Sequence, residues 1–180
     1  MSIIEAFKNT ITFIDGIKNE GIIEDYALIG GLALSAWIRP RTTKDIDLVV
    51  IVSKDTRWKD MASIIETRLH KKIAVMKGTQ RTHIKEKLSF MSGQIEVDII
   101  STRGFDLAAE AIKNAVVAEV FGKHVKVAVP EYLILLKLLP LSGQDAVDIK
   151  ALVKKADIKK LKILAQKHYL LTKLESLVSR

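Results

Sequence analysis

The 180-residue sequence contains no cysteine, and this absence excludes several classes of protein. Without cysteine, the chain has no disulfide scaffold, no cysteine-ligated zinc or iron–sulfur centre, and no thiol nucleophile. Its histidines are few, scattered, and without metal-ligand spacing: His70, His83, His124 and His168. Each is expected to be an ordinary surface or half-buried residue. Sites built on cysteine or on histidine clusters are therefore not expected here.

The sequence also lacks a long uninterrupted apolar segment. The most apolar stretch, YLILLKLLPL, is interrupted by Lys137 and Pro140 and is too short to span a bilayer. Charged residues run through the amino-terminal stretch MSIIEAFKNTITFIDGIKNE, which is typical of an amphipathic helix rather than of a signal peptide. We expect a soluble, cytoplasmic protein with no membrane partner.

Two common phosphate-binding motifs are absent as well. Neither G-x-x-x-x-G-K-[ST] nor G-x-G-x-x-G occurs, so a kinase-like or Rossmann-type nucleotide site is disfavoured. Positive charge, by contrast, is in excess, with a formal net charge of +8 and an isoelectric point near 9.6. This excess favours an anionic partner such as RNA, DNA or a nucleotide, although a lysine-rich soluble surface would give the same charge.

The apolar residues follow patterns that predict an α+β fold. Hydrophobic residues make up 48% of the sequence, which is enough for a packed core. Alternating or continuous apolar runs predict strands within residues 26–31, 45–52, 72–77 and 93–101, and a hairpin over 116–129. Helical spacing predicts helices before and between them, one of which is capped by Asp55 or Thr56. We expect a sheet core over residues 1–129 and a helical region over 130–180 that packs on it.

Two aspartates, Asp45 and Asp47, begin the apolar segment DIDLVVIV. On a strand they share a face, and two carboxylates so close together repel each other unless a cation lies between them. Asp98 lies on a later predicted strand, so the three acids converge if the two strands are neighbours. Carboxylate oxygens suit Mg²⁺ or Mn²⁺, and three carboxylates can hold two such ions about 4 Å apart. Alternatively, the first two acids merely begin a strand and the third is an exposed residue of an alternating one.

A glycine pair precedes the acids. Gly30 and Gly31 close a short predicted strand, just before a helix that starts at Leu32. Backbone N–H groups at a helix start, with no side chains in the way, favour an anion. The loop RPRTTK adds basic side chains for phosphate: Arg39, Arg41 and Lys44. A glycine anion site, a basic loop and an acid pair together fit nucleotidyl transfer. A haloacid-dehalogenase phosphatase also uses two aspartates one residue apart, but there the apolar strand precedes them. Here the apolar strand follows them, which excludes that class.

The segment IGGLALSAWIRPRTTKDIDLVV, with a later apolar–Asp–apolar strand, resembles the core of the nucleotidyltransferase superfamily that includes DNA polymerase β. It resembles in particular the small prokaryotic nucleotidyltransferases related to the toxin of the type IV abortive-infection system. The closing helices of that group are matched here by EYLILLKLLPLSGQDAVDIKALV. The resemblance implies a nucleotidyltransferase-fold mixed β-sheet with flanking helices, followed by a C-terminal helical region.

The resemblance also implies roles for individual residues. The triphosphate would be bound by Gly30, Gly31, Arg41, Lys44 and Lys137, and Mg²⁺ or Mn²⁺ by Asp45, Asp47 and Asp98. The last of these acids would serve as base or as ligand of a second metal. Asp145 and Asp148 would stand beside Lys137 in the second half of the cleft. Alternatively, the lysine covers apolar surface with its stem and Asp148 is a residue of a polar helix face.

We therefore expect an enzyme that transfers a nucleoside monophosphate from an NTP to an acceptor hydroxyl and releases pyrophosphate. The acceptor would be RNA, such as the tRNA end that the toxin resemblance implies, a protein side chain or a small molecule. The resemblance also implies an antitoxin or helical partner protein. One alternative is a catalytically silent nucleotide- or RNA-binding regulatory module of the same fold. Another is a structural or antitoxin-binding protein that acts through its helical tail.

Overall fold

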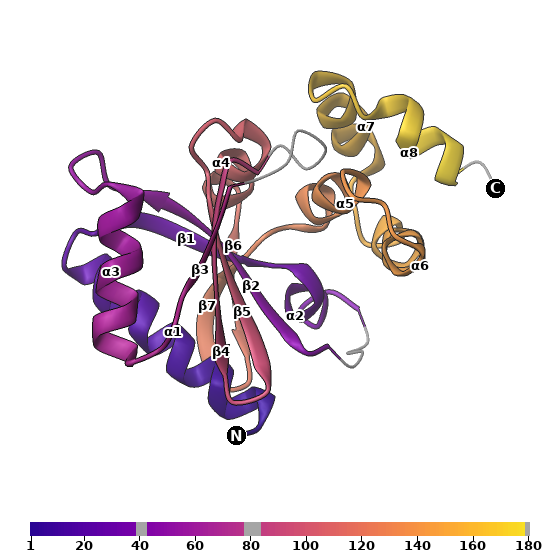
Figure 1. The fold of residues 1–180 in the computed structure, drawn as a ribbon. Coiled ribbons are helices and arrows are strands. Elements are labelled where there is room, and N and C mark those ends of the chain that lie inside the picture. Colours follow the sequence, from indigo (N-terminus) through magenta and orange to yellow (C-terminus); the bar gives the residue numbers. More distant parts are fainter. Residues whose placement is uncertain (39–42, 78–83, 179–180) are drawn as a thin grey trace.

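The computed structural model describes residues 1–38, 43–77 and 84–178, which form a seven-stranded mixed sheet with helices on both sides (Figure 1). The predicted α+β class is confirmed. In chain order the elements are α1 (Ile3–Asn19), β1 (Ile23–Ile29), α2 (Gly30–Leu34), β2 (Asp45–Val52), α3 (Trp58–Leu69), β3 (Ala74–Lys77), β4 (Glu86–Ser92), β5 (Ile95–Ser101), α4 (Asp106–Lys113), β6 (Val116–Val120), β7 (Lys123–Val127), α5 (Pro130–Leu138), α6 (Gly143–Val153), α7 (Ile158–Lys167) and α8 (Leu171–Val178).

Strand β2 lies at the centre of the sheet, whose order is β3-β4-β5-β2-β1-β7-β6. It pairs with β1 antiparallel and with β5 parallel. Its Val- and Ile-rich sequence is buried on both faces after the first residues, as predicted, whereas Asp45 at its start is exposed. A central strand of this kind needs apolar residues on both sides because helices cover both faces of the sheet.

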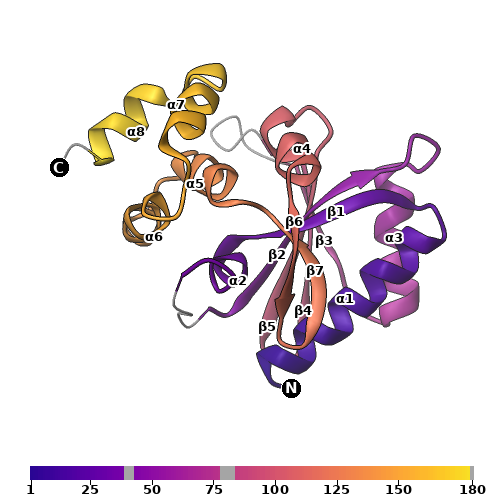
Figure 2. The same cartoon turned by 180° about the vertical axis from the view of Figure 1, so that it is seen from behind.

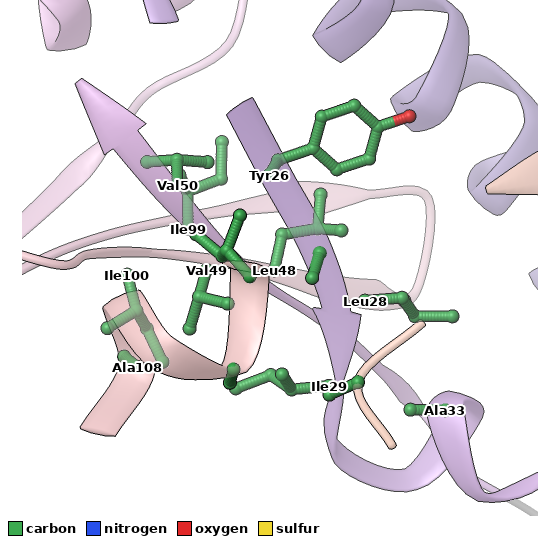
Figure 3. Packing of buried hydrophobic residues seen from close by; sticks show 14 of the residues in the cluster. Tyr26, Leu28, Ile29, Ala33, Leu48, Val49, Val50, Ile99, Ile100 and Ala108 are labelled. Carbon is green, nitrogen blue, oxygen red and sulfur yellow. The ribbon is translucent and has the colours of Figure 1, made fainter. Parts of the chain in front are cut away.

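Helices α1 and α3 lie on one side of the sheet, and α2 with α5 and α6 lies on the other (Figures 1 and 2). Tyr26 of β1 points toward the α1 side and donates its hydroxyl to Asp15 at 2.6 Å. On the opposite face, Val49 and Ile100 lie toward Ala108 of α4 (Figure 3). Because side chains alternate along a strand, Asp47 shares the face of Val49. The acids therefore lie on the side of the C-terminal helices.

Several element boundaries differ from the sequence prediction. The strand β4, Glu86–Ser92, was not predicted, because only Leu88 and Phe90 give it an apolar alternation. Helix α2 begins at Gly30 rather than at Leu32 and has five residues. The prediction that Asp55 or Thr56 caps α3 is wrong: Arg57 is the N-cap residue and makes no side-chain cap.

The helices after β7 follow clear local signals. Pro130 occupies the first turn of α5, where its missing N–H costs no helical hydrogen bond. Helix α6 begins with a capping box in which Ser142 and Asp145 each bond the other's backbone N–H. Helix α5 contacts α2, α4, α6 and α7, and it is buried along most of its length. The proposed division of the chain into residues 1–129 and 130–180 stays a prediction. Among the helices of the described residues, none has the length and apolar character needed to cross a membrane.

Candidate active site

The strand register brings the acids of two strands together. Asp47 of β2 pairs directly with Asp98 of β5, while Asp45 pairs with Glu96. The condition set by the sequence, that the two strands are neighbours, is therefore met. Asp45 is exposed at the beginning of β2, and Asp47 and Asp98 are half-buried. Side chains opposite each other on neighbouring strands lie close together, so the carboxylates face each other on one side of the sheet.

Gly30 lies against the carboxylate of Asp47. A Cβ added at Gly30 would lie 1.9 Å from Asp47 Oδ2, and the glycine has a left-handed backbone with φ +65°. Any side chain here would collide with the acid and strain the backbone. From the sequence, this glycine is predicted to allow the close approach of a phosphate. In the structure, the space that a side chain would fill holds the carboxylate of Asp47.

The charge of Asp47 is poorly compensated. Burial, the negative charge of Asp98 and that of Asp45 together raise the pKa of Asp47 to about 7, although Lys137 and Lys87 act in the opposite direction. A carboxylate whose pKa is raised by burial and like charge becomes stable as an anion when a cation binds beside it. This electrostatic state fits a site that receives a cation.

Asp98 differs from the other two acids because a lysine already neutralises it. Lys87 of β4 lies with its Nζ 2.7 Å from Asp98 Oδ2, and Ser89 donates its hydroxyl to Asp98 Oδ1. Ser89 pairs directly with Asp98 in the β4–β5 ladder, and Lys87 lies two residues before it on the same face. Sequence reasoning missed both residues because it missed β4. The Gly93–Gln94 turn before β5 is the signal that could have revealed an antiparallel partner strand.

A cavity of about 650 Å³ opens beside the acids. One wall is formed by the end of β1, the glycine turn and the start of β2, and the other by α5 and the start of α6. Most of the residues predicted for the site line it: Gly30, Gly31, Lys44, Asp45, Asp47, Lys137 and Asp145. Asp98 does not line this cavity and lies one strand farther along the sheet. The predicted phosphate ligand Arg41, like Arg39, lies outside the described residues.

Lys137 is held by two acids of α6. Its Nζ lies 2.9 Å from Asp145 Oδ1 and 2.8 Å from Asp148 Oδ2. Burial raises the pKa of Asp145, but hydrogen bonds from Lys137 and Ser142 outweigh it, and the pKa lies below its usual value. Asp148 is only 2% exposed. The alternative interpretations, a lysine that covers apolar surface and an acid on a polar helix face, are therefore not supported.

The acids at the start of β2 fit a hard divalent cation. Their ligands are carboxylate oxygens, and within the described residues no hydrogen bond donor engages the Asp47 carboxylate. As they stand, however, no three acidic or histidine side chains in residues 1–38, 43–77 and 84–178 are gathered into an arrangement that could hold a metal. The carboxylate of Asp98 is instead bound by Lys87 and Ser89. The metal-binding roles of the three acids stay predictions.

Comparison with solved structures identifies the fold. One similar structure is an antigenic nucleotidyltransferase-like protein from Paracoccidioides brasiliensis, which is 16% identical, with a TM-score of 0.57 over 97% of this chain and 93% of that one. The antibiotic-resistance factor ANT(2'')-Ia is 16% identical, with a TM-score of 0.59 over 94% of this chain and 96% of that one. A Thermotoga maritima protein described as a nucleotidyltransferase is 18% identical, with a TM-score of 0.54 over 87% and 97%. At such low identities the likeness establishes the nucleotidyltransferase fold.

The sequence itself carries a family signature. No curated protein matches the chain at a significant level. The family described as the nucleotidyl transferase AbiEii toxin of type IV toxin–antitoxin systems, by contrast, matches residues 13–173, which include both walls of the cavity. The match spans most of the chain, and it agrees with the resemblance drawn from the glycine pair and the acids. The chain therefore belongs to the AbiEii family of nucleotidyltransferase toxins.

Proposed function

We propose that the protein binds a nucleoside triphosphate with Mg²⁺ or Mn²⁺, transfers the nucleoside monophosphate to an acceptor hydroxyl, and releases pyrophosphate. One observation carries the proposal: Asp47, beside Asp45 and Asp98 and against Gly30, has a pKa raised to about 7 and lines a cavity that Lys44 and Lys137 also line. Membership of the family supports an enzyme of this class, with an NTP as substrate and an antitoxin as its genetic partner.

Each residue has a task in this proposal. Asp45 and Asp47 would hold the divalent cation, which when bound neutralises phosphate charge and supports departure of pyrophosphate. Lys137 has three N–H donors, of which Asp145 and Asp148 fix two in place. Its charge is balanced by the two acids, and its remaining N–H donor would bind an oxygen of a triphosphate in the cavity. Lys44 is exposed at the cavity wall and would add a second positive charge.

The reaction requires one bond to form and one to break. The acceptor oxygen bonds to the α-phosphorus, the bond from the α-phosphorus to its bridging oxygen breaks, and pyrophosphate leaves with the electron pair. The acceptor hydroxyl also loses a proton, and Asp98, which is predicted to serve as base or as ligand of a second metal, would take it. Both oxygens of Asp98 already accept hydrogen bonds, from Lys87 and Ser89. Each carboxylate oxygen has a further lone pair, and the proton would bind there.

The acceptor is the least defined part of the proposal. ANT(2'')-Ia has been solved with adenylyl-2''-tobramycin, a small molecule, but its likeness to this chain extends to the fold alone. The net charge of +8 favours an anionic acceptor, and RNA, such as a tRNA end, is the acceptor we favour. A protein side chain and a small molecule are the other two.

The test is a transfer assay with the full chain. Each of the four NTPs, labelled at the α-phosphate, is incubated with Mn²⁺ or Mg²⁺ and either total RNA or the protein alone, beside an Asp45→Asn/Asp47→Asn variant. We expect label on RNA with the wild type and none with the variant. Label on the protein itself would identify a protein acceptor. NTP binding without transfer would support the silent module. The absence of both NTP binding and transfer would contradict the proposal.

A further inference from the structure

Lys87 and Asp98 form a sheltered ion pair beside the other two acids. The lysine Nζ lies 2.7 Å from Asp98 Oδ2, and the side chains are 21% and 15% exposed. An ion pair this sheltered from water is screened much less than a surface pair. Ser89, itself only 7% exposed, donates to the other oxygen of Asp98. Asp98 therefore already has one cation and one neutral donor on its two oxygens.

The strand register holds this arrangement in place. Ser89 is the direct partner of Asp98 in the β4–β5 ladder, and Asp98 is the direct partner of Asp47 in the β2–β5 ladder. The three side chains form one row across the sheet, with Lys87 diagonally beside it. Lys87 also lowers the pKa of Asp47, so its charge is felt by the neighbouring acid. The ammonium group of Lys87 thus binds the third carboxylate, which would otherwise be free to bind a metal.

We propose that the ammonium group of Lys87 takes the place of a second divalent cation, so that the chain binds one such ion, at Asp45 and Asp47, rather than two. This inference rests on the proposed function, because it assigns the ion content of the same site. In formal charge, one divalent ion and one lysine together balance the three carboxylates. A second divalent ion beside Lys87 would instead leave the metal-loaded acids with a net positive charge.

The test counts Mn²⁺ bound to the full chain in the absence of nucleotide, by the loss of the free-ion EPR signal during titration. We expect one ion per wild-type chain and two per Lys87→Gln chain, because the glutamine releases Asp98 to the metal. Two ions about 4 Å apart, the spacing of two-metal sites, also broaden each other's spectrum, which gives a second readout for the variant. Lys87→Arg keeps a cation at this position and is expected to bind one ion.

Lys85→Gln is the matched control. Lys85 is an exposed lysine just before β4, and its replacement removes the same charge without touching Asp98. It is expected to bind one ion, like the wild type. Two ions on the wild-type chain would overturn the inference, and this count does not depend on how well any variant folds. A single ion on a folded Lys87→Gln chain would overturn it as well. No ion on the wild-type chain would instead contradict the proposed metal-dependent function, and the inference with it.

Discussion

The missing side chain of Gly30 makes room for the carboxylate of Asp47. A Cβ at Gly30 would lie 1.9 Å from Asp47 Oδ2, and its backbone φ of +65° is one that other residues rarely adopt. The glycine turn and the acid therefore form one unit, in which the end of β1 sets the position of the acid on β2. This relationship gives the first of the predictions.

Gly30→Ala is expected to abolish transfer and to lower the free energy of unfolding by more than about 2 kcal/mol, because the clash and the strained backbone add together. Urea denaturation and the transfer assay measure the two effects. Gly16→Ala in α1 is the matched control, since a Cβ there meets nothing within 4 Å. It should leave activity unchanged and raise stability by up to about 1 kcal/mol. A fully active Gly30→Ala protein would refute the close packing of glycine and acid.

Asp47→Asn is expected to stabilise the metal-free protein at alkaline pH while it abolishes activity. The folded-state pKa of Asp47 is about 7, against a usual value of 3.8. The folded state therefore binds the proton more tightly than the unfolded state, and stability falls as the pH rises between these two values. Above pH 7 the asparagine removes this penalty, for a gain on the order of 2 kcal/mol. Urea denaturation in EDTA at about pH 5 and pH 8 measures it, with a larger gain expected at the higher pH.

The exposed Asp55 supplies the control for this experiment. Asp55→Asn should change stability by less than about 0.5 kcal/mol at either pH. A loss of stability in Asp47→Asn at pH 8 would mean that the carboxylate charge stabilises the apo fold, contrary to its raised pKa.

Divalent-ion affinity should fall as the medium becomes more acidic than pH 7. A proton and the cation compete for the Asp47 carboxylate, whose pKa is raised to about 7 by burial and by the charges of Asp98 and Asp45. Each pH unit below this value is expected to weaken Mn²⁺ binding by up to about tenfold. Calorimetric titration between about pH 5.5 and pH 8 measures the dependence. Affinity that does not change over this range would show that Asp47 is not a ligand.

Lys137→Met is expected to abolish transfer and to destabilise the protein by roughly 3 kcal/mol, since Asp145 and Asp148 lose a partner in a sheltered position. Thermal or urea unfolding measures the loss. Lys150→Met on the same helix as the two acids is the control, because Lys150 is exposed. It should retain activity and change stability by less than about 0.5 kcal/mol. Equal behaviour of the two variants would show that Lys137 has no special role.

The sequence predicted those parts of the site that depend on local pattern. Asp45 and Asp47 share a strand, so alternation alone places them on one face. The glycine pair ends the preceding strand. The segment between the glycines and Asp45 is short, so the glycine pair cannot lie far from the acids. The convergence with Asp98 needed more, because the register of two strands far apart in the chain is set by the whole sheet. Only the family resemblance supplied that step.

The parts that could not be predicted depend on contacts between distant segments. Lys87 and Ser89 lie on a strand whose apolar alternation is too short to stand out, and their partner Asp98 is fixed only by pairing. The glycine at position 30 was predicted to admit a phosphate, which stays a prediction, whereas its packing against a carboxylate on another strand could not be foreseen. From the sequence alone, Lys137 could be an ordinary helix residue. Its role depends on the packing of α6, which places two acids beside it.

The central claim is that this acidic site moves a nucleoside monophosphate rather than a phosphate. Parallel reactions with an NTP labelled at the α- or at the γ-phosphate test it most directly, with the acceptor and the released products separated in each. We predict that the α-label enters the acceptor, that the γ-label leaves as pyrophosphate, and that Asp45→Asn/Asp47→Asn does neither. Entry of the γ-label into the acceptor, or transfer by that variant at the wild-type rate, would contradict the claim.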